Sequence, residues 1–234
     1  YNMGYNDGGY GVLSSASLER WVTNIEYSVK LAREANPKIR MILASPIPNE
    51  VMVSKEPRWV SREWYPYALL SFGQEEAKLA RRLGVSFVDT GLLYGQSMGL
   101  GQVAAGESFA LSRDGVHPQR EGQTFIAFHL LRGLGADPLV ASVAIDAGKA
   151  KVTDKQRCKI SDIAVKDGVL SFRRECESLP YPTPPEARPF AFLARIDDNL
   201  SADILTVTGL GTNAYTLYVD DRKLGDVAAK ELED

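Results

Sequence analysis

The chain has 234 residues, of which 44% are hydrophobic and 24% charged, and its formal net charge is −3. This composition is typical of a globular protein, and the scattered Lys and Arg residues exclude the basic stripe that nucleic-acid binding requires. No apolar run approaches the roughly 20 residues that a membrane-spanning helix needs. We therefore expect neither a nucleic-acid partner nor a membrane span.

The first half of the chain alternates helical and strand patterns. Apolar residues recur at helical spacing after Ser17, and short apolar runs lie between the helical patterns. The predicted order is helix (17–35), strand (38–48), helix (75–84, ended by Gly84), strand (85–90) and a third helix in the later part of residues 114–135. The Gly-rich stretch that follows Thr90 and contains Ser97 is expected to be a loop. This alternation predicts an α/β fold with a parallel sheet and crossover helices.

The pattern changes after Asp137-Pro138. Short runs rich in β-branched residues follow, with a turn at Asp167-Gly168 and a proline-rich connector, "LPYPTPPEARP". We expect two domains, residues 1–138 with the α/β fold and residues 139–234 as an antiparallel β module.

Two cysteines flank the predicted Asp167-Gly168 hairpin. A three-residue loop from Lys166 to Gly168 would place Cys158 directly opposite Cys176. A two-residue Asp-Gly turn fits the apolar pattern better and puts the cysteines on opposite faces. The sequence therefore favours two unpaired cysteines, although a disulfide stays open.

Two loops carry residues suited to catalysis. His117 follows Asp114 by three residues in "SRDGVHP", a spacing that allows the carboxylate to orient the imidazole for proton transfer. Asn6 lies in "GYNDGG", where its amide could stabilise a developing oxyanion, although such a stretch also forms simple turns. His129 lies on an apolar helix face and is expected to pack there.

Together, "GYND" and the later "DGVHP" followed by "EGQTFIA" resemble the third and fifth sequence blocks of the SGNH (GDSL-type) hydrolase family. The resemblance covers residues 1–135 and implies a three-layer α/β fold and a Ser-His-Asp esterase that needs no cofactor. It implies that His117 is the general base, Asp114 its orienting partner and Asn6 an oxyanion donor, with Gly4 and Asp7 supporting the loop.

The family's Gly-Asp-Ser block, which carries the nucleophile, does not occur in the 234 residues, and neither does its second block. We therefore expect an N-terminally truncated chain, also cut at its C-terminus, that is inactive as given. The resemblance further implies a small-molecule or polysaccharide ester substrate and an exported protein, with residues 139–234 as an accessory module seen in some bacterial members.

Two alternatives stay open. "YGQSMGLG" matches Gly-x-Ser-x-Gly around Ser97, the nucleophile elbow of α/β-hydrolases, although the strand and helix that an elbow needs are not predicted on either side. A loop serine is the preferred interpretation. The other alternative is a non-catalytic protein whose β module binds a glycan or a cell surface. Two distant histidines and two cysteines without ligand spacing predict no metal site.

Overall fold

The computed structural model describes residues 4, 6–10, 12–48, 64–211 and 214–233, which form two compact units. The first unit contains residues 1–136 and 182–196, and the second contains residues 137–181 and 197–234. Residues 182–196 thus pack with the first unit, although they follow the boundary expected at residue 138. None of the helices in the described ranges is long and apolar enough to cross a membrane.

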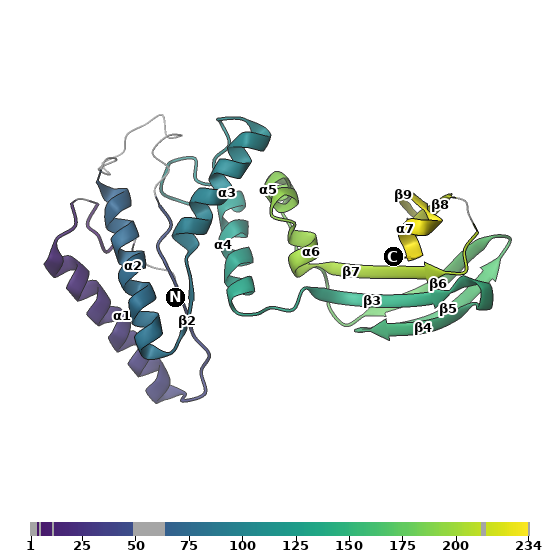
Figure 1. Ribbon diagram of the computed structural model, residues 1–234, viewed down its shortest axis with the longest axis horizontal. Helices are drawn as coiled ribbons and strands as arrows, with labels where there is room; N and C mark the ends of the chain where they lie inside the picture. Colours follow the sequence, from purple (N-terminus) through teal and green to yellow (C-terminus); the bar gives the residue numbers. More distant parts are fainter. Residues whose placement is uncertain (1–3, 5, 11, 49–63, 212–213, 234) are drawn as a thin grey trace. The chain divides into compact units, whose positions relative to one another are not determined.

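The first unit mixes helices with a short parallel strand pair, as the sequence predicts (Figure 1). Its elements are α1 (Ser15–Ala35), β1 (Ile42–Ala44), α2 (Tyr65–Leu83), β2 (Ser86–Val88), α3 (Thr90–Ala105), α4 (Arg120–Gly133), the 3₁₀ turn η2 (Pro185–Ala187) and α5 (Arg188–Leu193). A further helix, α6 (Ile196–Leu200), crosses the boundary between the units. The predicted helices and strands of residues 17–133 are present, and α2 begins ten residues before its predicted start.

Helix α1 packs along α2 through the apolar face that its sequence predicts. Trp21, Ile25 and Val29 are buried, and the Trp21 ring stacks on Phe72 of α2 with 4.7 Å between centroids. Helix α2 ends at Gly84, whose φ of 61° is the left-handed conformation that glycine adopts without strain. We call the cluster of buried α1 and α2 residues the α1–α2 core. Tyr10, Leu13 and Val116 lie against it, so loops that are distant in sequence rest on one apolar surface.

Strands β1 and β2 pair in parallel, with Leu43 opposite Phe87. Their carboxyl ends place Ser45 beside Asp89, and the Ser45 hydroxyl donates a 2.7 Å hydrogen bond to Asp89 Oδ1. Helices α2 and α4 both contact the two strands. Of the predicted parallel sheet, the described part of the chain contains this pair, and the three-layer arrangement stays a prediction.

The prediction of a loop over the Gly-rich stretch is wrong, because residues 90–105 form helix α3. The Asp89 side chain caps its N-terminus by accepting a hydrogen bond from the Leu92 N–H. Gly101 allows close packing, since a Cβ at this position would lie 2.0 Å from the ring of Phe109. Tertiary contacts therefore override the low helix propensity of glycine.

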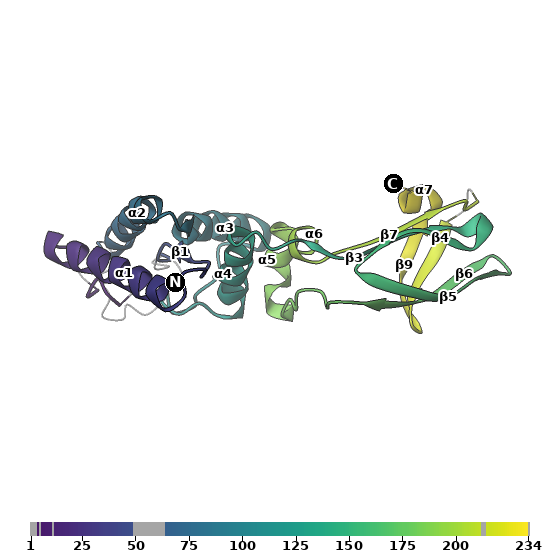
Figure 2. The same cartoon turned by 90° about the horizontal axis from the view of Figure 1, so that it is seen from below.

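The second unit consists mainly of strands, drawn from teal to yellow in Figures 1 and 2. Its elements are β3 (Leu139–Asp146), η1 (Ala147–Lys149), β4 (Lys151–Gln156), β5 (Cys158–Lys166), β6 (Val169–Cys176), β7 (Ala202–Thr208), β8 (Ala214–Val219), β9 (Arg222–Ala228) and α7 (Ala229–Glu233). The sheet order β4-β3-β7 joins an antiparallel pair to a parallel one. The prediction of an antiparallel module is therefore wrong for β3 and β7. Parallel strands need a long crossover connection, and here it includes β4, β5, β6, α5 and α6.

The structure also corrects the expected placement of the cysteines. The hairpin turn is Asp167-Gly168, as the apolar pattern indicates, yet Cys158 and Cys176 are register partners. A register shift between Ser161 and Ala164, where Asp162 has a φ of 54°, moves the rest of β5 by one residue. Both cysteines are free, and Cys158 is buried while Cys176 is half-buried.

We predict that oxidation closes a Cys158–Cys176 disulfide. The neighbouring Glu177 N–H donates to Arg157 O, so the cysteines form a non-hydrogen-bonded pair, whose Cα separation of about 4.5 Å suits a disulfide. Glutathione disulfide should accept two electrons and two protons from the thiols, giving two glutathione thiols. Burial raises the pKa of Cys158, so the reaction should accelerate with pH.

Mass spectrometry should find the loss of two hydrogen atoms and a Cys158–Cys176 cross-linked peptide, together with an increased Tm. Cys176→Ser is the control and should retain one thiol without cross-linking. Two glutathione adducts without an internal cross-link would contradict the register.

Glu76 of α2 is a carboxylic acid buried beneath β1. It is fully buried, and neither oxygen hydrogen-bonds to a residue in the described ranges. Burial raises the pKa of Glu76 to about 8, and Asp89 adds to the rise, although the nearby Ala44 backbone amide favours the charged form. Glu76 is therefore mainly protonated at neutral pH when the chain is folded.

We predict that Glu76→Gln stabilises the protein above pH 7. The folded pKa of Glu76 exceeds its unfolded value of 4.5, so wild-type stability should fall as the pH rises between about 4.5 and 8. The variant cannot ionise at this position, so its free energy of unfolding should exceed that of the wild type at pH 8. The gain should be limited to about 1–3 kcal/mol, because the amide that replaces the carboxyl would still be buried without a partner. Thermal melts from pH 5 to 9 test this, with Glu75→Gln as the control, since Glu75 pairs with Lys78 at the surface.

Candidate active site

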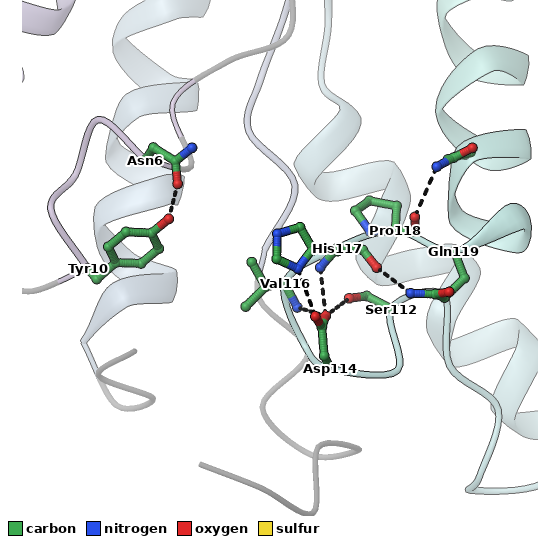
Figure 3. Close-up of polar contacts among 9 residues, drawn as sticks. Asn6, Tyr10, Ser112, Asp114, Val116, His117, Pro118 and Gln119 are labelled. Carbon is green, nitrogen blue, oxygen red and sulfur yellow. Dashed lines mark hydrogen bonds and ion pairs between the residues drawn. The ribbon is translucent and has the colours of Figure 1, made fainter. Parts of the chain in front are cut away.

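Asp114 and His117 lie on the loop between α3 and α4 and contact each other directly (Figure 3). His117 Nδ1 lies 2.7 Å from Asp114 Oδ2. The other carboxylate oxygen, Oδ1, accepts hydrogen bonds from the backbone N–H groups of Val116 and His117, at 2.9 and 2.8 Å. One carboxylate thus folds the loop with one oxygen and orients the imidazole with the other.

This loop is held against the start of α4 by close packing. Gln119 N–H donates to Leu111 O at 3.0 Å and closes the loop. A Cβ on Gly122 would lie 2.5 Å from Leu111 O, so only glycine permits this approach. Pro118 contributes the other side of the contact, with its Cβ 2.8 Å from the same point. The position of His117 is therefore set by packing and by backbone hydrogen bonds.

The electrostatics of the pair favour an ionised carboxylate. Partial burial acts to raise the pKa of Asp114, but the backbone N–H and ring of His117, together with the Val116 N–H, hold it well below its usual range. The His117 side chain is 75% exposed, so its ring can reach a substrate. An ionised Asp114 that accepts from Nδ1–H leaves Nε2 as the proton acceptor.

Asn6 lies in a tight turn that its glycines make possible. Asp7 N–H donates to Gly4 O, and Gly9 N–H donates to Asn6 O. Gly4 has a φ of 114°, and a Cβ at this residue would lie 2.6 Å from the Pro46 side chain. Tyr5, the second residue of the predicted motif, lies outside the described residues.

The Asn6 side chain is exposed, and its Oδ1 accepts a hydrogen bond from the Tyr10 hydroxyl (Figure 3). This contact fixes the amide and leaves Nδ2–H₂ available as a donor. Asp7 is exposed in the same turn. Asn6 makes no hydrogen bond to His117 in the structure. The two predicted catalytic loops are instead connected through the α1–α2 core, because Tyr10 of one loop and Val116 of the other both contact it.

Ser97 lies within helix α3, which corrects its interpretation as a loop serine and removes the strand–turn–helix context that a nucleophile elbow requires. His129 packs on α4 between Phe125 and Phe128, as expected. Burial lowers the pKa of His129 to about 4, so it is neutral near pH 7. Among the described residues, no group of three or more His, Cys, Asp or Glu could hold a metal ion.

Two contributors to the site could not be identified from the sequence. Ser112 Oγ lies 3.3 Å from Asp114 Oδ1, and Tyr10 orients Asn6. Tyr10 reaches Asn6 because Gly9 and Tyr10 have φ values of 64° and 59°. The sequence "NDGGY" indicates a turn at this place. It does not indicate that the Tyr10 hydroxyl donates to Asn6, because this contact depends on the φ angles of Gly9 and Tyr10.

The chain is similar in structure to a gut microbial diltiazem-metabolizing enzyme, with a TM-score of 0.73 and 22% sequence identity. The match covers 99% of this chain and 56% of that enzyme, so the chain spans just over half of its length. This likeness shows a shared fold. A protein from Parabacteroides merdae described as a GDSL-like lipase gives a TM-score of 0.44 at 22% identity, over 57% of each chain. No protein-family model and no curated protein matches the sequence.

We predict that the Asp114 carboxyl resists protonation because the Val116 N–H, the His117 N–H and the His117 ring stabilise its charged form. Its NMR titration midpoint should lie below the 3.8 of an unperturbed aspartate. Its contribution to folding stability is therefore present above about pH 4 and is lost as the pH falls through the lower folded pKa. Carboxyl ¹³C shifts measured against pH test this. His117→Ala should raise the midpoint, whereas an unchanged midpoint would show that the imidazole contact does not form in solution.

Proposed function

We propose that the chain is part of an SGNH-type (GDSL-type) serine ester hydrolase. The observation that carries the proposal is the 2.7 Å contact between His117 Nδ1 and Asp114 Oδ2, in a loop that keeps the carboxylate ionised. The "GYND" and "DGVHP" motifs and the fold shared with the diltiazem-metabolizing enzyme support it.

In the proposed reaction, His117 Nε2 accepts the proton of a serine hydroxyl supplied from outside these 234 residues. The serine attacks the ester carbonyl, and Asp114 stabilises the imidazolium that results. Asn6 Nδ2–H donates to the oxyanion, since Tyr10 already occupies its Oδ1. The imidazolium protonates the leaving alcohol, and water activated by His117 then releases the acid.

The substrate class is an acyl or acetyl ester, borne by a small molecule or a polysaccharide. Diltiazem, which carries an acetate ester, is a reasonable small test substrate because the neighbour of like fold metabolizes it. Export of the protein, and an accessory role for residues 139–234, belong to the same proposal.

We predict that His117→Ala in the full-length protein lowers kcat for 4-nitrophenyl acetate by about 10²–10⁴-fold, because the general base is lost. Asn6→Ala should lower kcat by about 10²–10³-fold through loss of an oxyanion donor. The measurement is the initial rate with 4-nitrophenyl acetate and with diltiazem.

The control is His129→Gln, which changes the chain's other histidine. The His129 ring packs against Phe125 and Phe128 and belongs to a different contact from that of Asp114 with His117. Its kcat should remain within about twofold of wild type while its Tm reports folding. Full activity in His117→Ala, with melting unchanged, would refute the proposal.

A further inference from the structure

An open cavity of about 630 Å³ lies in the first unit at the carboxyl ends of β1 and β2. Its walls are largely apolar, and they come from the segment after β1, from α2 and from α3. The apolar residues in these walls include Pro46, Pro66, Leu69, Leu70 and Leu92. Leu70 and Leu92 are 58% and 59% exposed, although they are large apolar side chains. A cavity of this size at strand carboxyl ends is typical of a small-molecule site.

Of the described residues that line the cavity, one has a charged side chain, Asp89. Its Oδ1 accepts from the Ser45 hydroxyl and from the Leu92 N–H, which fixes the carboxylate. No residue in the described ranges donates to Oδ2, and the side chain is exposed. No Lys or Arg is among the described residues that line the cavity. An apolar cavity with one anchored anion is complementary to an apolar cation.

Pro46 connects this cavity to the Asn6 loop. It lines the cavity, and its ring lies against Gly4, two residues before Asn6. Pro46 therefore lies between a group bound in the cavity and the loop that carries Asn6, the proposed oxyanion donor. Neither Asn6 nor His117 lines the cavity, so it is separate from the proposed catalytic contacts.

We propose that the cavity binds an apolar group that carries a protonated amine, and that it selects ester substrates with such a group. The apolar part contacts Leu69, Leu70 and Leu92, and the ammonium pairs with Asp89 Oδ2. The selection of substrates rests on the proposed hydrolase function, whereas the binding of the amine does not.

Two glycines of α3 provide a matched pair of variants. Gly95 lines the cavity, and a Cβ there meets nothing within 4 Å, so a leucine side chain would project into open space. Gly99 lies one turn later, has the same open surroundings and does not line the cavity. Both changes raise helix propensity. Gly95→Leu should fill the site, and Gly99→Leu should leave it intact.

The test is an NMR titration of the full-length protein with 4-phenylbutylamine and with the neutral 4-phenylbutan-1-ol. The amine should bind about three- to tenfold more tightly, as expected for a partly exposed ion pair. Asp89→Asn keeps an oxygen for the Ser45 and Leu92 contacts and should make the two affinities equal. Gly95→Leu should weaken amine binding at least tenfold, and Gly99→Leu should change it less than twofold.

Equal affinities for amine and alcohol in the wild type, or equal losses in the two glycine variants, would overturn the proposal. Thermal melts check folding, and Asp89→Asn tests the site independently if Gly95→Leu unfolds. Initial rates with amine-bearing and neutral acetate esters separate the two proposals. Amine binding without ester hydrolysis supports the cavity as a ligand site and refutes the hydrolase, whereas hydrolysis with amine binding unaffected by Gly95→Leu refutes the cavity alone.

Discussion

The Asp114 carboxylate organises the proposed catalytic loop because both of its oxygens accept hydrogen bonds from residues within three positions. Oδ1 binds the Val116 and His117 N–H groups, and Oδ2 binds the His117 ring. The same donors that fold the loop also stabilise the charged carboxylate. Loop conformation, imidazole orientation and carboxylate charge therefore depend on one side chain, and replacing it would disturb all three together.

The hydrogen bond between Ser45 and Asp89 organises the carboxyl ends of β1 and β2, as Asp114 organises the proposed catalytic loop. Ser45 and Asp89 follow neighbouring parallel strands, so the register of β1 and β2 brings their side chains together. Ser45 Oγ also accepts from the Gly91 N–H at 2.9 Å, and Asp89 caps α3. This contact holds the start of α3 beside Pro46, which in turn lies against Gly4. The Asn6 turn, the cavity and the strand ends thus share one set of supports.

Features that depend on local sequence could be predicted, and those that depend on distant contacts could not. The apolar spacing of Trp21, Ile25 and Val29 predicts α1 and its buried face, and the Asp114–His117 spacing predicts the loop that brings carboxylate and imidazole together. Helix α3 could not be predicted, because its glycines have low helix propensity and its stability comes from packing and from the Asp89 cap. The catalytic roles of Asn6, Asp114 and His117 stay predictions.

The second unit shows the same limit in its strands. The Asp167-Gly168 turn follows from its residue types, but a single register shift near Asp162 changes which residue faces Cys176. The parallel pairing of β3 with β7 depends on a long connection that runs through β4, β5 and β6 and then two short helices, α5 and α6. The proline-rich sequence before α5 does not predict these helices. One-residue differences in register invert which face a side chain occupies, so periodicity alone cannot determine cross-strand partners. Chemistry that depends on such partners, as the cysteine pair does, needs the structure, whereas chemistry within one loop is already visible in the sequence.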